Sequence, residues 1–156
     1  MKKKVILIQA AQMEGEKVRK VEKSYIVSRT MPYLAALFSE YSHEEWEVVL
    51  IDDYLKGERI IDKTADLYAI TAMAATLGRA IQIGEILKSQ NPKTPVIIGG
   101  PGPTASLDEI KDLVCFDSIF VGEAEMTLRQ FLEDFERGTI KKIYCSDRGL
   151  LQELEI

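Results

Sequence analysis

The sequence predicts an α/β fold, a three-layer, doubly wound domain built on a five-stranded parallel sheet. Two observations support this prediction: short runs of branched apolar residues recur along the chain, and segments with helical spacing of apolar residues lie between them. Continuous apolar character is typical of strands buried on both faces, as in a parallel sheet covered by helices. Strands that alternate with helices in this way imply right-handed crossovers.

The expected strands lie at residues 5–8, 48–51, 67–70, 96–98 and 119–121. Apolar residues three and four apart predict helices over residues 34–41, 77–87 and 128–135. A shorter helix is expected over residues 106–113, because Ser106-Leu107-Asp108-Glu109 fits a capping box. The link over residues 52–66 is too short for a full helix. Five such strands most often take the Rossmann-like, flavodoxin-like order 2-1-3-4-5.

The length and composition suit one folded domain. The chain has 156 residues, of which 46% are hydrophobic and 29% charged, and its Gly and Pro content is ordinary. We expect a single domain over residues 1–156, with its core at 4–144, a long loop at 12–30 and a C-terminal tail at 145–156. The long loop is either a functional lid or a flexible insertion without function. Its part at 14–23 has the pattern of a polar helix.

The charge balance restricts the partners. With 20 Lys and Arg against 25 Asp and Glu, the net charge is −5, so the chain has no basic footprint for nucleic acid or an anionic membrane. The sequence has no apolar stretch of membrane-spanning length, and its first apolar run is too short for a signal peptide. We expect a cytoplasmic protein in which Cys115 and Cys145 are reduced thiols. Association into a homo-oligomer stays open, because exposed apolar patches are not readable from the sequence.

The sequence assigns no catalytic residue and no metal ligand. His43 is the only histidine and is expected to face solvent, and one His with two distant Cys does not supply a metal site. Asp52 and Asp53 end the second strand, whereas a phosphoacceptor receiver domain would place its acids after the first strand, where Gln9 and Ala10 stand. A self-sufficient enzyme is therefore disfavoured.

The candidate binding residues lie in loops after the strands, where a doubly wound sheet binds its ligands. The loop at 99–104 begins with two glycines, which let a large flat ligand approach the backbone. Pro101 and Pro103 have no N–H to offer a phosphate, so this is neither a phosphate loop nor a dinucleotide fingerprint. A tight strand-to-helix turn is the alternative interpretation.

The loops after the third and fifth strands complete the candidate site. The segment 71–76 offers small side chains and two hydroxyls, although Thr76 also suits a helix cap. Glu123 is a candidate ligand contact, whereas Glu125 suits the helix dipole. The full set of candidate cofactor-binding residues is Gln9, Ala10, Thr71, Ala72, Met73, Thr76, Gly99, Gly100, Pro101, Thr104, Gly122 and Glu123.

Taken in order, several segments resemble the cobalamin (vitamin B12)-binding domain found at the N-terminus of many radical S-adenosylmethionine enzymes. They are Met31-Pro32 and residues 49–53, 66–73, 96–104 and 116–125, so the resemblance covers most of residues 4–144. The resemblance implies a Rossmann-like domain that holds the corrin over the carboxyl ends of its strands, with the nucleotide tail beside the sheet. It also implies that Thr71, Ala72, Met73 and Thr76 line the tail cavity, that Gly99 and Gly100 let the tail pass, and that Gly122 and Glu123 close its far side.

Two departures from related proteins qualify what the resemblance implies. Methionine synthase and the mutases carry Asp-x-His-x-x-Gly after the first strand, whose His ligates cobalt, but residues 9–15 here contain no His. Any cobalamin is therefore expected to lack a histidine axial ligand from this loop. The radical enzymes continue into a barrel with a Cys-x-x-x-Cys-x-x-Cys motif, which this sequence lacks, so no iron–sulfur cluster is expected in this chain.

Two hypotheses from different classes follow. The first is a cobalamin-binding module that is not catalytic by itself, either the N-terminal domain of a radical S-adenosylmethionine enzyme or a free-standing relative, with the catalytic domain as a candidate partner. The alternative is a Rossmann-like domain that binds another small molecule or a protein and does not bind cobalamin.

Overall fold

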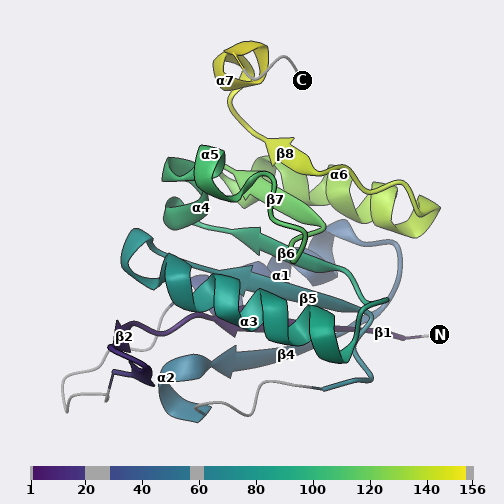
Figure 1. The fold of residues 1–156 in the computed structure, drawn as a ribbon. Helices are drawn as coiled ribbons and strands as arrows, with labels where there is room; N and C mark the ends of the chain where they lie inside the picture. Colours follow the sequence, from purple (N-terminus) through teal and green to yellow (C-terminus); the bar gives the residue numbers. More distant parts are fainter. Residues whose placement is uncertain (1, 20–28, 57–61, 154–156) are drawn as a thin grey trace.

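A computed structural model describes residues 2–19, 29–56 and 62–153 (Figure 1). Its main element is a six-stranded parallel sheet in the order β4-β1-β5-β6-β7-β8. The strands in chain order are β1 (Lys3–Gln9), β4 (Trp46–Asp52), β5 (Leu67–Thr71), β6 (Val96–Gly99), β7 (Ser118–Val121) and β8 (Ile143–Cys145). The α/β fold class is confirmed, and the first five strands of this sheet have the predicted order 2-1-3-4-5.

The predicted strand count is wrong by one, because β8 adds a sixth strand at the edge of the sheet. It has only three residues and a single fully buried side chain, Tyr144, so it has no apolar run that resembles those of the other strands. The Tyr144 hydroxyl donates to Asp134 Oδ2 at 2.8 Å and accepts from the Lys141 N–H at 3.0 Å. These contacts attach the strand to the helix that precedes it.

Helices cover both faces of the sheet, as the three-layer prediction required. One face is covered by α1 (Thr30–Tyr41) and α6 (Ala124–Arg137), and the other by α3 (Leu77–Gln90), α4 (Pro101–Ala105) and α5 (Leu107–Ile110). In Figure 1, α3 crosses in front of the sheet and α1 lies behind it. The remaining helical segments are α2 (Asp53–Lys56), the short 3-10 turn η1 (Ala74–Thr76) and α7 (Arg148–Glu153).

Alternate residues of each central strand pack into different cores. On β1, Ile6 and Ile8 belong to the core beneath α3 and α5, while Val5 and Leu7 belong to the core beneath α1 and α6. All four are at most 2% exposed. This burial on both faces explains why the strand sequences are apolar without alternation.

The long loop contains a hairpin where a polar helix was predicted. Strand β2 (Met13–Glu14) pairs antiparallel with β3 (Lys17–Val18), and Gly15 in the turn has a φ of 62°. Glycine adopts this left-handed conformation without steric cost, which favours a tight turn at this point over a continuous helix. The predicted helix at 14–23 is therefore wrong for residues 14–19, and its remainder lies outside the described residues.

The capping box predicted at Ser106 is wrong, and the alternative interpretation of Thr76 as a helix cap is not supported. Ser106 precedes α5 but makes no side-chain capping hydrogen bond, and α5 ends at Ile110 rather than at residue 113. Thr76 precedes α3, yet its hydroxyl does not cap that helix. Instead, Thr76 Oγ1 accepts from the Met73 N–H at 2.9 Å and closes the η1 turn.

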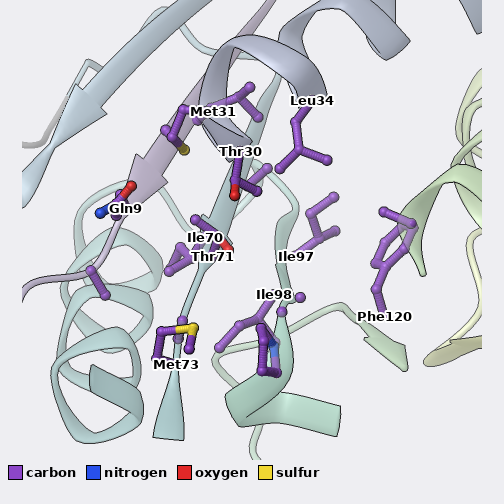
Figure 2. Close-up of a pocket in the computed structure, with 18 of the residues that line it drawn as sticks. Gln9, Thr30, Met31, Leu34, Ile70, Thr71, Met73, Ile97, Ile98 and Phe120 are labelled. Carbon is purple, nitrogen blue, oxygen red and sulfur yellow. The ribbon is translucent and has the colours of Figure 1, made fainter. Parts of the chain in front are cut away.

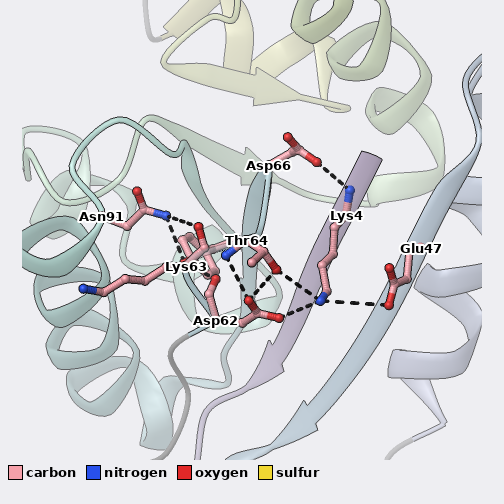
Figure 3. Close-up of polar contacts among 8 residues, drawn as sticks. Lys4, Glu47, Asp62, Lys63, Thr64, Asp66 and Asn91 are labelled. Atoms are coloured by element: carbon pink, nitrogen blue, oxygen red, sulfur yellow. Dashed lines mark hydrogen bonds and ion pairs between the residues drawn. The ribbon is translucent and has the colours of Figure 1, made fainter. Parts of the chain in front are cut away.

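A polar network joins the amino ends of the strands, at the opposite edge from the loops that carry the candidate site (Figure 3). The Lys4 ammonium is 2.6 Å from Asp62 Oδ2, and the Lys4 backbone N–H donates to Asp66 Oδ2 at 2.7 Å. Asp62 also accepts from the Thr64 N–H at 2.9 Å. These contacts fix the segment that leads into β5.

In the part of the chain that the structure describes, the only histidine and the two cysteines belong to no group of three or more His, Cys, Asp and Glu residues that could hold a metal ion. His43 is exposed between α1 and β4, and Cys115 and Cys145 are both free thiols, of which Cys115 is buried. No helix within the described residues is both long and apolar enough to cross a membrane.

Candidate ligand site at the carboxyl edge of the sheet

A cavity of about 670 Å³ opens at the carboxyl ends of β1, β5, β6 and β7 and extends between the sheet and the helices α1 and α6 (Figure 2). Every candidate residue that the sequence indicated lies on its lining: Gln9, Ala10, Thr71, Ala72, Met73, Thr76, Gly99, Gly100, Pro101, Thr104, Gly122 and Glu123. The strand order reverses at this place, between β1 and β5, so the cavity lies where doubly wound sheets bind ligands.

The register of three strands creates the hollow. Gln9, Thr71 and Gly99 are aligned across β1, β5 and β6 at the rim, and Leu7, Ala69 and Ile97 are aligned two residues further down the same face. Within these two rows, Ala69 on β5 and Gly99 on β6 have little or no side chain. Their small size leaves space between the sheet and the covering helices.

The glycines of the β6–α4 loop have separate roles. A Cβ on Gly99 would lie 3.2 Å from Phe120 Cβ, on the cavity side of the strand. Gly100 has a φ of 111°, and its Cβ would lie 2.7 Å from the Ala72 carbonyl oxygen, so this glycine allows close packing of two loops. Gly102 belongs to the same contact, because its N–H donates to that oxygen at 2.9 Å. Gly100 therefore fits the tight-turn interpretation, and Gly99 shapes the cavity.

Thr104 connects the loops that follow β6 and β7. Its Oγ1 donates to the Gly100 carbonyl oxygen at 2.9 Å and accepts from the Gly122 N–H at 3.0 Å. Gly122 has a φ of 82°, and a Cβ there would collide with Ser146 Oγ. Ser146 Oγ in turn accepts from the Glu123 N–H at 3.0 Å, so the far side of the cavity is held by the strand β8 and the residue after it.

A buried ion pair holds the loop after β1. Asp53 is fully buried, and its two carboxylate oxygens accept from Arg79 Nε at 2.8 Å and Nη2 at 3.0 Å. Asp53 Oδ2 also accepts from the Ala11 N–H at 3.1 Å, and the Tyr54 hydroxyl accepts from the Gln12 N–H at 2.9 Å. The paired aspartates at 52 and 53 were visible in the sequence, but nothing in the sequence indicated that Arg79 is the partner.

The helix walls of the cavity were not found from the sequence. Residues of α1, β7 and α6 that were not among the candidates also line it: Thr30, Met31, Tyr33, Leu34, Phe38, Phe120, Ala124, Glu125 and Leu128. The sequence contained only an indirect indication of these walls. The apolar spacing of α1 and α6 indicated faces that pack on a sheet, but not that the two helices leave a gap between them.

The mouth of the cavity combines exposed apolar and acidic groups. Tyr33 of α1 is 49% exposed and Met73 is 58% exposed, although both line the cavity. A side-chain hydrogen bond with Glu125 of α6 is the main cause that raises the pKa of the Tyr33 hydroxyl. Tyr33 on α1 and Glu125 on α6 both line the cavity, so the entrance carries an acidic and a phenolic group.

The arrangement suits a large ligand with a polar part at the rim and an apolar part inside. Within the described ranges, no group of three or more His, Cys, Asp and Glu residues is placed to hold a metal ion. The parallel sheet, the reversal of strand order and the cavity together define an α/β ligand-binding domain.

The comparisons with known proteins identify the family. The family profile described as "B12 binding domain" matches residues 17–132. The chain therefore belongs to the B12-binding domain family, which confirms the family expected from the sequence.

Two known proteins are similar to the chain in sequence or in fold. Over 122 residues the chain is 27% identical to "Uncharacterized methyltransferase PH0819" of Pyrococcus horikoshii, which covers 72% of this chain and 27% of that protein. The structure of the radical S-adenosylmethionine methyltransferase TsrM from Kitasatospora setae, with cobalamin and a [4Fe-4S] cluster bound, superposes with a TM-score of 0.63 at 15% identity. That match covers 88% of this chain and 25% of TsrM, and it shows the fold. The chain thus spans about a quarter of the length of each of these relatives.

Proposed function

We propose that this chain is a cobalamin-binding module that holds the corrin over the carboxyl ends of β1, β5 and β6 and takes the nucleotide tail into the cavity beside the sheet. The observation that carries the proposal is the cavity itself, which begins at the reversal of strand order and continues to an apolar interior beneath α1 and α6. Family membership supports the choice of ligand.

The residues present fit such a group. The volume of about 670 Å³ lies within the range of about 300 to 1,000 Å³ that is usual for ligand pockets. The absence of a side chain at Gly99 and the methyl group of Ala69 leave the central strands accessible, and a Cβ at Gly99 would narrow this part of the cavity. In this proposal, Met73, Tyr33 and Glu123 at the mouth would contact the corrin and its amide groups.

Bound cobalamin would supply a cobalt centre able to carry a methyl group, and the residues of this chain would bind and orient the cofactor. No acid–base pair or nucleophile of this chain enters the proposal. Gln9 ends β1, and no histidine lies on the loop that follows it within residues 9–15, while His43 lies near the amino end of β4. The proposal is therefore a cofactor held without a histidine axial ligand from the β1 loop.

We propose further that the chain forms a single domain that works in the cytoplasm with a radical S-adenosylmethionine catalytic domain. The sequence itself has no Cys-x-x-x-Cys-x-x-Cys motif, so any iron–sulfur cluster would be held by the partner domain. The similarity to one quarter of TsrM supports this arrangement.

Binding of hydroxocobalamin to the purified chain tests the proposal. The cofactor should co-elute with the protein in gel filtration, and its visible spectrum should shift. The variant Ala69→Leu fills the centre of the cavity and should lose the cofactor while its circular dichroism stays that of a folded protein. Ala36→Leu adds the same side chain on the exposed face of α1 and serves as the matched control. Elution of the cofactor free of the unmodified chain would overturn the proposal.

A further inference from the structure

The lining of the cavity changes from polar to apolar with depth. Polar side chains such as Gln9, Thr71 and Glu123 lie at the ends of the strands, where the cavity opens. Below this rim the walls include Leu7, Leu34, Phe38, Ile97, Phe120 and Leu128. In Figure 2, Leu34 of α1 points toward the same space as Ile97 and Phe120 of the sheet. The inner cavity therefore presents hydrocarbon from both the helices and the sheet.

The backbone at the floor of the cavity also offers few hydrogen-bonding groups. Beneath the rim, the floor is formed by β5 and β6, whose residues Tyr68 to Thr71 are paired in parallel register with Val96 to Gly99. β5 pairs on its other side with β1, and β6 with β7, so the N–H and C=O groups of both strands face neighbouring strands. A ligand part that reaches this depth has hydrocarbon as its main contact among the described residues.

We infer that the inner cavity selects cobamides by the base at the end of their nucleotide tail, and that it favours apolar aromatic bases over purines. The inference rests on the proposed function. Phenols and dimethylbenzimidazole present carbon and methyl groups along the outer edge of the ring. Adenine presents an amino group and additional ring nitrogens, which lose their hydrogen bonds to water at this depth and find no partner on the walls named above.

The expected discrimination follows from the cost of burying an unpaired polar group. That cost corresponds to an affinity about 10- to 100-fold lower for a cobamide with a purine base than for a cobamide with an apolar base of similar size. An apolar base gains binding free energy instead, because its ring contacts Phe120, Leu34 and Ile97.

The test compares cresolyl cobamide with adeninyl cobamide, both in the same cobalt oxidation state, by titration of the purified chain. Cresol does not bind cobalt, whereas a ring nitrogen of adenine can bind it in the free cobamide. Both compounds are therefore titrated with cobalt in the Co(I) state, in which no base nitrogen is bound and its release does not lower the measured affinity. We expect cresolyl cobamide to bind about 10- to 100-fold more tightly. Cobinamide, which has no base, should bind more weakly than cresolyl cobamide.

The outcomes separate this inference from the proposed function. Equal affinities for the two cobamides, or for cresolyl cobamide and cobinamide, would overturn base selection and leave cobalamin binding intact. Failure of all three compounds to bind would overturn the proposed function instead.

A pair of variants assigns the selection to the inner wall. Leu34→Gln places an amide inside the cavity and should reduce the preference for cresolyl cobamide, because a buried partner becomes available to adenine. Ala36→Gln introduces the same amide on the exposed face of α1 and should leave the preference unchanged. An unaltered preference in a folded Leu34→Gln protein would contradict the assignment to this wall.

Discussion

Removal of the Arg79 guanidinium should destabilise the fold strongly. In the variant Arg79→Met, the Asp53 carboxylate stays fully buried and loses two hydrogen bonds, of 2.8 and 3.0 Å, from the guanidinium. Only the Ala11 N–H, at 3.1 Å, remains among the Asp53 contacts described above. Removing one partner of a buried pair costs about 3 to 5 kcal/mol, because the other charge is left uncompensated. A domain typically has about 5 to 15 kcal/mol of stability, so this loss is a large part of the total.

Urea unfolding followed by circular dichroism measures this loss. The double variant Asp53→Asn/Arg79→Met removes both charges and keeps a side-chain oxygen for the Ala11 N–H, so it should be more stable than Arg79→Met alone. Lys93→Met removes an exposed cation and controls for the change in net charge. A loss below about 1 kcal/mol in Arg79→Met, which is the range of exposed pairs, would refute the reasoning. A double variant no more stable than the single one would refute it as well.

Two further predictions concern groups far from the cavity. A hydrogen bond from Lys4, followed by two from Thr64, lowers the pKa of Asp62 to about 2, so this carboxylate stabilises the fold above its ordinary pKa of 3.8 and the contribution is lost as the pH falls toward 2. Lys4→Gln should move the pKa of Asp62 back toward 3.8 in an NMR titration, and an unchanged value would contradict the contact. Burial raises the pKa of the Cys115 thiol, which is only 4% exposed, so Ellman's reagent should modify the more accessible Cys145 first. Faster labelling of Cys115 would contradict its burial.

The sheet was predictable from the sequence because burial on both faces leaves a clear pattern. The runs at 5–8 and 96–98 have no polar residue, and the structure shows both inside the sheet, each between two other strands. The edge strand β8 was missed because only Tyr144 is fully buried within its three residues. The β2–β3 hairpin was missed because the charged residues around Gly15 suit an exposed helix as well as an exposed turn.

The candidate site was predictable for a topological reason. Once the strands are assigned, the rule for doubly wound sheets places the loops after β1, β5, β6 and β7 together, and all of their candidate residues line one cavity. The detailed roles of the hydroxyls were not predictable. Thr76 and Thr104 are typical of ligand donors and of caps, and only the structure shows that Thr76 bonds to Met73 within its own turn and that Thr104 connects the loops after β6 and β7.

The walls supplied by α1 and α6 depend on three-dimensional packing. Leu34 and Leu37 have the same side chain and lie on adjacent turns of one helix, yet Leu34 faces the cavity and Leu37 is 3% exposed within the core. The difference comes from the space above Ala69 and Gly99, which belong to other elements. A helical pattern alone does not contain that information.

The span of the cavity along the chain links folding to the supply of its ligand. Lining residues run from Leu7 to Leu128, so the cavity exists only when strands distant in sequence have already paired. A ligand of this cavity therefore binds the folded chain and not the unfolded one, and at a hundredfold excess over its dissociation constant it adds about 2.7 kcal/mol of stability. The chain with this ligand bound will therefore unfold at a higher temperature than the same chain without it, and the difference will grow with the concentration of the ligand.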